Sequence, residues 1–270
     1  MVEKHCMELH CLGTAGYHPN QSRHTSCYAL PDLSIVLDAG SGFFRLKPLL
    51  QSDSLHILLS HTHLDHVVGL TFVYCLYHQL PLANIHVYAL QQKLDIIREH
   101  LFHEQLFPIT PPLRWHALED QGSRFQIGEA QIEWFELEHP GGSIGYRIEH
   151  PNTSFAYITD TTSHPDSTYW NRIQGVDWLL HECNFSDEFQ DFAVKTGHSW
   201  QSAVVQGAAA ARVKNLVLTH FDPNLTDVKS LGMNSPSPAC SGDPSQARQI
   251  ALPEQIILAA DEMRLDIGRL

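Results

Sequence analysis

The amino-acid sequence predicts an α/β fold in which two β-sheets pack face to face and helices cover both outer faces. Three features predict this sandwich. The chain opens with short strand-like runs, continues with strands that alternate with helical segments, and enters a second group of strands after a proline-rich stretch. With 270 residues, of which 43% are hydrophobic, the chain is long enough to bury a core of this size.

In the first half of the chain, three short runs separated by turn residues predict a strand meander: MELHCLG, SCYAL and SIVLDAG. The apolar run LHILLS (55–60) predicts a strand that is buried on both faces. Beyond residue 66, the segments VVGLTFVYCLYHQL and QQKLDIIREHLFHEQL are helix-like, and NIHVYAL between them is strand-like. Such an alternation is typical of an α/β sheet.

The second half, after the proline-rich stretch at 107–113, is dominated by strand patterns: RFQIGEAQIEWFELEH, SIGYRIEH, SFAYITD, VDWLLHECN and NLVLTH. Ser199 stands where we expect the N-cap of the alanine-rich helix WQSAVVQGAAAARV. The final IILAADEMRLDI predicts a short helix and a last strand. Residues 222–253 are rich in proline, serine and glycine, which predicts a mobile loop, and this loop and the segment 100–114 are candidates for setting specificity.

Charge and the lack of targeting segments limit the partners that we expect. The formal net charge is −13, from 17 Lys and Arg against 30 Asp and Glu, so the chain has no broad basic field of the kind that nucleic-acid binding uses. The longest apolar runs stop well short of the roughly 20 residues that cross a bilayer, and no signal-peptide core opens the chain. The cysteines form no C-x-x-C pair, which suits a reducing compartment. We therefore expect a cytoplasmic protein without membrane contact.

The motif HTHLDH (61–66) directly follows the buried strand, and four of its residues can bind a metal ion. His61 and His63, two residues apart, can face one ion, while Asp65 and His66 can face a second. A lone pair of histidines would be a weak signal in a chain with 19 of them. The complete H-x-H-x-D-H pattern at a strand end is much more specific.

Two ions need about six or seven ligands, and three later strands end in a residue that can supply one. His139 ends WFELEH, Asp160 ends SFAYITD, and His220 ends NLVLTH. An α/β sheet presents its functional groups where its strands end, and a carboxylate can place one oxygen on each of two ions. Each residue alone could be an ordinary polar strand end, but together with HTHLDH they predict a binuclear site. Nitrogen and oxygen ligands with imidazole in the majority favour zinc, with manganese or iron as alternatives.

These motifs, together with LGTAG and LDAG near the N-terminus, resemble the metallo-β-lactamase superfamily over essentially the whole chain. The resemblance implies a four-layer αββα sandwich of two mixed β-sheets flanked by helices, as a single hydrolase domain over residues 1–270. It implies three ligands for one ion (His61, His63 and His139), three for the other (Asp65, His66 and His220), and Asp160 as a bridge. Because superfamily members are often dimers, we also expect a homodimer.

Two segments outside the ligand set bear on the reaction. HECNF (181–185) and GHS (197–199) resemble segments of ribonuclease Z that hold a hydrogen-bonded Glu and His beside the metals, which implies a Glu182–His198 pair here. A carboxylate raises the basicity of an imidazole, so such a pair could protonate a leaving alkoxide. The alternative is that His198 only caps a helix. The resemblance also gives Asp65 a catalytic role, as acceptor of the proton of the attacking water.

This arrangement favours phosphodiester hydrolysis, in which a hydroxide held between the ions attacks phosphorus while Glu182 and His198 assist the leaving group. The interval from His139 to Asp160 is too short for the arm with which ribonuclease Z clamps tRNA, and the chain is acidic. A small or cyclic phosphodiester is therefore favoured over tRNA. Three alternatives stay open: a ribonuclease Z-like endoribonuclease that processes tRNA 3′ ends, a glyoxalase-like thioesterase, and a metal-binding protein without turnover.

Overall fold

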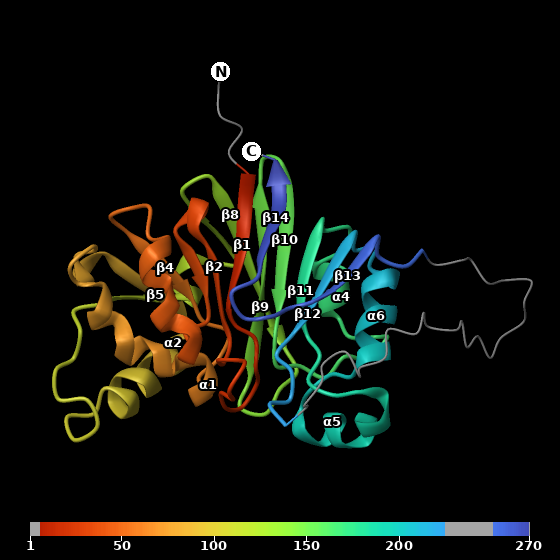
Figure 1. The fold of residues 1–270 in the computed structure, drawn as a ribbon, viewed down its shortest axis with the longest axis horizontal. Coiled ribbons are helices and arrows are strands. Elements are labelled where there is room, and N and C mark those ends of the chain that lie inside the picture. The colour runs from red at the N-terminus through yellow and green to blue at the C-terminus, as the bar shows by residue number, and fades with distance from the viewer. Residues whose placement is uncertain (1–5, 225–250, 270) are drawn as a thin grey trace, which may run out of the picture.

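Two seven-stranded sheets form the centre of the computed structural model, which describes residues 6–224 and 251–269 (Figure 1). The first sheet has the spatial order β14 (Arg264–Arg269), β1 (Cys6–Gly13), β2 (Cys27–Leu30), β3 (Ile35–Leu37), β4 (Leu55–Leu58), β5 (Ile85–Ala89) and β6 (Arg114–Ala117). The second has the order β13 (Gln255–Leu258), β12 (Asn215–Thr219), β11 (Trp178–Glu182), β10 (Thr153–Ile158), β9 (Ser143–His150), β8 (Ala130–Leu137) and β7 (Arg124–Ile127). Both sheets are mixed, because antiparallel pairs on one side give way to parallel pairs on the other. The predicted fold class is confirmed.

Helices flank both sheets. The described α-helices are α1 (Leu64–Val67), α2 (Gln91–Ile96), α3 (Leu118–Gln121), α4 (Tyr169–Arg172), α5 (Gln190–Thr196) and α6 (Gln201–Ala210). Five 3₁₀-helices are also described, η1 (Pro31–Leu33), η2 (Ser41–Leu49), η3 (Val68–Leu76), η4 (Leu82–Asn84) and η6 (Asp187–Phe189), and η5 (Ile97–Leu101) is a π-helical turn. Figure 1 shows α2 on the outer side of the first sheet and α4 and α6 on the outer side of the second. No helix in the described parts of the chain is long and apolar enough to cross a membrane.

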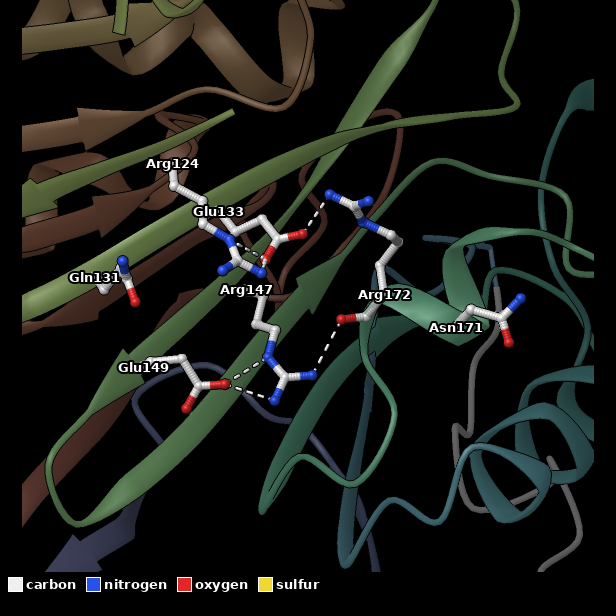
Figure 2. A pocket seen from close by; sticks show the side chains of 7 residues that line it. All are labelled: Arg124, Gln131, Glu133, Arg147, Glu149, Asn171 and Arg172. Carbon is white, nitrogen blue, oxygen red and sulfur yellow. Dashed lines mark hydrogen bonds and ion pairs between the residues drawn. The ribbon is translucent and has the colours of Figure 1, made fainter. Parts of the chain in front are cut away.

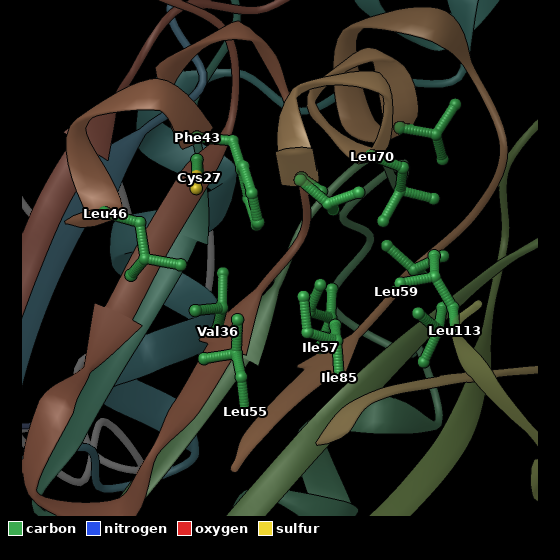
Figure 3. Packing of buried hydrophobic residues seen from close by; sticks show 14 of the residues in the cluster. Cys27, Val36, Phe43, Leu46, Leu55, Ile57, Leu59, Leu70, Ile85 and Leu113 are labelled. Atoms are coloured by element: carbon green, nitrogen blue, oxygen red, sulfur yellow. The ribbon is translucent and has the colours of Figure 1, made fainter. Parts of the chain in front are cut away.

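The core has three apolar layers, one between the sheets and one between each sheet and its helices. The strand β4 shows how one strand serves two of them, because successive side chains point to opposite faces. Ile57 packs in the layer on the helix side, which Figure 3 shows, whereas Leu58 packs in the layer between the sheets. The apolar run around β4 is therefore continuous because both of its faces are buried. This packing holds the end of β4, where HTHLDH begins, in a fixed position.

Two local predictions are wrong. Helix α6 begins at Gln201 after Trp200, and the Ser199 hydroxyl does not cap it but donates to the carbonyl oxygen of Thr161 at 2.6 Å. The segment IILAADEMRLDI forms no helix; it contains parts of β13 and β14, because β13 pairs with β12 and β14 pairs with β1 at the edge of each sheet. Most of the predicted loop at 222–253 lies outside the described residues.

The helix predicted after HTHLDH is present only as the short α1 followed by η3. The reason is a close approach at Gly69. Its N–H donates to the carbonyl oxygen of Ala39 at 2.7 Å, and a Cβ built there would lie 2.4 Å from the carbonyl oxygen of Gly40. The segment is thus pressed against the loop that follows β3, and this contact brings the LDAG and HTHLDH motifs together.

Candidate metal centre

The predicted ligands meet at one end of the sandwich, where strands of both sheets end. HTHLDH follows β4 in the first sheet, while His139, Asp160 and His220 follow β8, β10 and β12 in the second. In Figure 1 this is the end at which α1 and α5 lie. All seven side chains fall into two groups whose donor atoms lie within 4.8 Å of one another: His61, His63, His139 and Asp160, and Asp65, His66 and His220.

The carboxylate of Asp160 lies between the two groups and turns one oxygen toward each. Its Oδ2 lies 3.5 Å from Nε2 of His61 and 3.5 Å from Nε2 of His139. Its Oδ1 lies 3.2 Å from Nε2 of His66 and 3.1 Å from Nε2 of His220. A single buried carboxylate, which follows β10, therefore joins donors that follow three other strands, β4, β8 and β12.

Each group is completed by one further donor. In the first, Nδ1 of His63 lies 3.3 Å from Nε2 of His139. In the second, Oδ2 of Asp65 lies 3.4 Å from Nε2 of His66 and 3.5 Å from Nε2 of His220. The Nε2 atoms of His66 and His220 are themselves 3.1 Å apart.

These separations fit metal binding. Donors about 2.0–2.1 Å from a tetrahedral zinc ion are roughly 3.3 Å apart, and the distances within both groups are close to that value. The Nε2 atom of His61 is buried, points into the first group and has no hydrogen-bond partner among the described residues. An orphaned buried nitrogen is costly, and a cation among these donors would satisfy it. The residues present therefore fit a pair of divalent ions.

The protonation states of the first group and of Asp160 also suit metal binding. Burial lowers the pKa values of His61, His63 and His139 below the ordinary value of histidine, so these imidazoles are neutral, which is the form that binds a metal. Burial alone would raise the pKa of Asp160, but His220, His66 and His61 hold it well below its usual range. Asp160 is therefore ionised.

The backbone is strained where it aims the ligands. Asp160 has φ of 42° and His220 has φ of 54°, although neither is a glycine. Asp38 and Tyr17, which contact ligands of the cluster, also have positive φ, at 56° and 57°. Such conformations cost of order 1–3 kcal/mol each and persist only where the surroundings impose them. Their concentration at this end of the sandwich is typical of a functional site.

A buried carboxylate that sequence reasoning did not assign, Asp38, orients two of the ligands. Its Oδ2 accepts a hydrogen bond from Nδ1 of His66 at 2.7 Å and one from the Ser60 hydroxyl, also at 2.7 Å. Ser60 in turn accepts from Nδ1 of His61 at 3.0 Å, and Tyr157 donates to Asp38 at 2.7 Å. The contacts to His66 and His61 each occupy the Nδ1 atom of the ring and leave Nε2 facing the cluster. The LDAG segment that contains Asp38 was the only sequence signal for it.

We expect Asp38→Asn to weaken metal affinity about 10- to 100-fold, the usual effect of removing a partner of a metal-bound histidine. Both oxygens of Asp38 accept hydrogen bonds, so the NH₂ group of an asparagine would face another hydrogen-bond donor in either orientation of its amide. Competition with a chromophoric zinc chelator measures the affinity. The exposed Asp95→Asn is the matched control. Unchanged affinity in a folded Asp38→Asn protein would show that Asp38 does not position the ligands.

The predicted pair of Glu182 and His198 forms beside the cluster. Nδ1 of His198 lies 3.1 Å from Oε1 of Glu182, and a ring nitrogen of His198 lies within 4.8 Å of donor atoms of Asp160 and His220. Glu182 is fully buried and accepts hydrogen bonds from the backbone N–H groups of Thr161 at 2.8 Å and Ser199 at 3.2 Å. Burial alone would lower the pKa of His198, but the Glu182 carboxylate raises it to about 9. The pair is thus a protonated imidazole held by a fixed anion.

Three further residues at the site carried no separate sequence prediction. The backbone N–H of Tyr17 donates to Oδ2 of Asp65 at 2.8 Å, which fixes that carboxylate. The preceding Gly16 packs so closely that a Cβ there would lie 2.5 Å from Cε1 of His220. Asn184 donates to the carbonyl oxygen of His220 at 3.1 Å. The second glycine of LGTAG, Gly16, was the only sequence signal for this close approach.

A cleft of about 410 Å³ opens directly onto the cluster. Its lining includes His63, Asp65, Asp160 and His220 of the cluster and also His198. A cavity of this size suits a small organic molecule. Both candidate metal positions and the Glu182–His198 pair therefore serve one substrate space.

The geometry agrees with a family comparison. The family model described as "Beta-lactamase superfamily domain" matches residues 34–221, which hold every residue of the cluster. The chain belongs to the metallo-β-lactamase superfamily. The resemblance stated from the sequence is confirmed, and so is the prediction of a metal-dependent hydrolase.

Within the superfamily, the chain is similar to enzymes named ribonuclease Z. It is 34% identical over 120 residues to the one from Synechococcus sp., a match that spans 44% of this chain and 35% of that protein. It is 25% identical over 272 residues to the one from Kineococcus radiotolerans, with 83% and 86% of the two chains covered.

Solved structures of the superfamily show the same fold. The protein YhfI from Bacillus subtilis superimposes with a TM-score of 0.75 at 18% identity, covering 96% of this chain and 99% of that one. The short form of human tRNase Z superimposes with a TM-score of 0.71 at 20% identity, covering 97% and 100%. At these identities the likeness concerns the fold alone.

Proposed function

We propose that the chain is a phosphodiesterase that uses two divalent metal ions and acts on small or cyclic phosphodiesters. The observation that carries this proposal is the placement of Asp160. One of its oxygens faces three histidines, the other faces a second set of donors, and the pair of Glu182 and His198 lies beside both.

The donor sets suggest how the ions would be held. His61, His63 and His139 would hold one ion, and Asp65, His66 and His220 the other, with Asp160 contacting both. Zinc is favoured by the majority of imidazole ligands, with manganese or iron as alternatives. Two bound cations would activate water for attack and neutralise negative charge on the phosphoryl group.

The protein's own groups would orient the reaction and move its protons. Glu182 holds Nδ1 of His198, which leaves Nε2 to hand a proton to the departing alkoxide. Asp65, ionised as a metal ligand, would accept the proton of the attacking water. Hydrolysis of a phosphodiester with an alkoxide leaving group needs a proton removed from the attacking water and a proton given to the alkoxide. A thiolate leaving group needs no proton, so thioester hydrolysis would not use His198.

Processing of tRNA 3′ ends is the second candidate, because the relatives compared above are named ribonuclease Z. The net charge of −13 speaks against a large polyanion. The described residues that line the cleft include neither lysine nor arginine. The homodimer and the cytoplasmic location stay predictions of the sequence.

One metal-loaded preparation, assayed side by side on bis(p-nitrophenyl) phosphate, cyclic AMP, precursor tRNA and a glutathione thioester, tests the proposal. We expect turnover of both small diesters, loss of that turnover after chelation, and its return on adding zinc. Faster cleavage of precursor tRNA than of either small diester would favour the second candidate. Turnover of the thioester alone would contradict both candidates.

A further inference from the structure

Resting on that proposed function, we infer that the cleft selects a phosphodiester with a single phosphate and one planar aromatic substituent, such as a nucleobase. The aromatic group would lie against Phe192 and Tyr17 at the mouth of the cleft. Both side chains line the cleft that opens onto the metal cluster, and both are exposed, Phe192 by 51% and Tyr17 by 78%.

An aromatic surface runs from the catalytic pair to the mouth. Phe185 packs edge-on against His198, with ring centroids 6.1 Å apart, and Phe192 packs edge-on against Phe185 at 5.3 Å. Tyr17 lines the same cleft from the loop after β1, and its backbone contact with Asp65 fixes its position. Large exposed aromatic side chains beside a reaction centre are typical of a binding surface, because a planar ligand can stack on them.

The charges around the cleft limit the substrate to one phosphate. The described residues that line it include the acids Asp65, Asp160 and Asp222 and neither lysine nor arginine. Proteins that bind single-stranded nucleic acid combine stacking aromatics with a basic groove along the backbone. Here the described lining has the aromatic side chains of such a site but no lysine or arginine. Outside the metal donor sets, the described lining offers a second phosphate no lysine or arginine, so a mononucleotide-sized diester fits better than an RNA strand.

The arginines that do gather in a hollow lie away from the cleft and are paired with glutamates. A hollow of about 500 Å³ on the second sheet holds Arg124, Arg147 and Arg172 (Figure 2), and none of its lining residues belongs to the metal cluster. Glu133 pairs with both Arg124 and Arg172, and Glu149 pairs with Arg147 at 2.5 Å. Each guanidinium of this hollow is therefore held by a glutamate, and the hollow lies apart from the metal cluster.

Two cyclic diesters with the same alkoxide leaving group test the inference: cyclic AMP and methyl ribofuranoside 3′,5′-cyclic phosphate, which lacks the base. We expect kcat/KM to be about tenfold or more higher for cyclic AMP, the usual size of one base–aromatic stacking contact. Phe192→Ala should lower this preference about tenfold, and Phe192→Tyr should keep it. Phe189 is equally exposed at 51% but does not line the cleft, so Phe189→Ala is the matched control and should leave the preference unchanged.

Equilibrium binding separates this inference from the proposed function. Calorimetric titration of zinc-loaded His198→Ala protein, which should turn over alkoxide diesters slowly, with thymidine 5′-(methyl phosphate) and with dimethyl phosphate should show tighter binding of the thymidine diester, with the difference lost when Phe192→Ala is added. Adding a 3′-phosphate to the thymidine diester should weaken binding. Equal binding of the two diesters, or tighter binding of the doubly phosphorylated compound or of precursor tRNA, would overturn the inference. Tight binding of the thymidine diester without turnover of any diester would contradict only the proposed function.

Discussion

Asp160→Ala is expected to lose bound metal and to lower the hydrolytic rate about a thousandfold or more. The estimate follows from the several kcal/mol of charge stabilisation that metal ions supply in such reactions, since each 1.36 kcal/mol changes a rate tenfold. The carboxylate of Asp160 faces donors of both groups at 3.1–3.5 Å, so its removal leaves both incomplete. Metal content per chain after dialysis, together with kcat/KM on bis(p-nitrophenyl) phosphate, measures both effects.

A second substitution protects this test against simple misfolding. Asp160→Asn keeps the size of the side chain and one carbonyl oxygen, so we expect it to fold and to retain at most one tightly bound ion. The exposed Asp95→Ala serves as the control and should match the unaltered protein. A folded Asp160→Ala protein that still carries two ions per chain would show that Asp160 does not bridge them.

His198→Ala is expected to slow hydrolysis in proportion to how much the leaving group needs a proton. General acid catalysis contributes about 10²–10⁴-fold, so cyclic AMP, which releases an alkoxide, should lose that much in kcat. Bis(p-nitrophenyl) phosphate releases a stable phenolate and should lose less than about tenfold, because its leaving group needs no proton. Kinetics on both substrates with one enzyme preparation give the two ratios.

The partner of His198 should show the same pattern. Glu182→Gln removes the charge that holds His198 protonated, so we expect a smaller loss with the same dependence on the leaving group. The control substitution His100→Ala, at an exposed residue, should leave kcat on both substrates unchanged. Equal losses on both substrates in His198→Ala would mean that His198 has a structural role and is not the proton donor.

The fold could be predicted from the sequence because burial between its layers determines which positions are apolar. β4 lies between two apolar layers and is correspondingly apolar, and the strands that carry the ligands are followed within a few residues by His or Asp. The grouping of seven ligands followed from that placement, since strand ends of an α/β sheet lie at a common edge. The structure brings all seven together.

Residues that position a ligand through a hydrogen bond or close packing left no comparable pattern in the sequence. Asp38 lies 28 positions before His66 and is recognisable only once the loop after β3 is seen to pack on the loop after β4. Asn184 and Gly16 contact His220 from elements far away in the chain. The error at Ser199 has the same origin: its local position suits a helix cap, but a tertiary contact with Thr161 takes its hydroxyl.

Crystals of zinc-loaded protein, measured at the zinc absorption edge, test the binuclear centre most directly. Two anomalous peaks are predicted, one on each side of the Asp160 carboxylate, the first among His61, His63 and His139 and the second among Asp65, His66 and His220. A single peak, or peaks that lie away from Asp160, would contradict a two-metal site at this end of the sandwich.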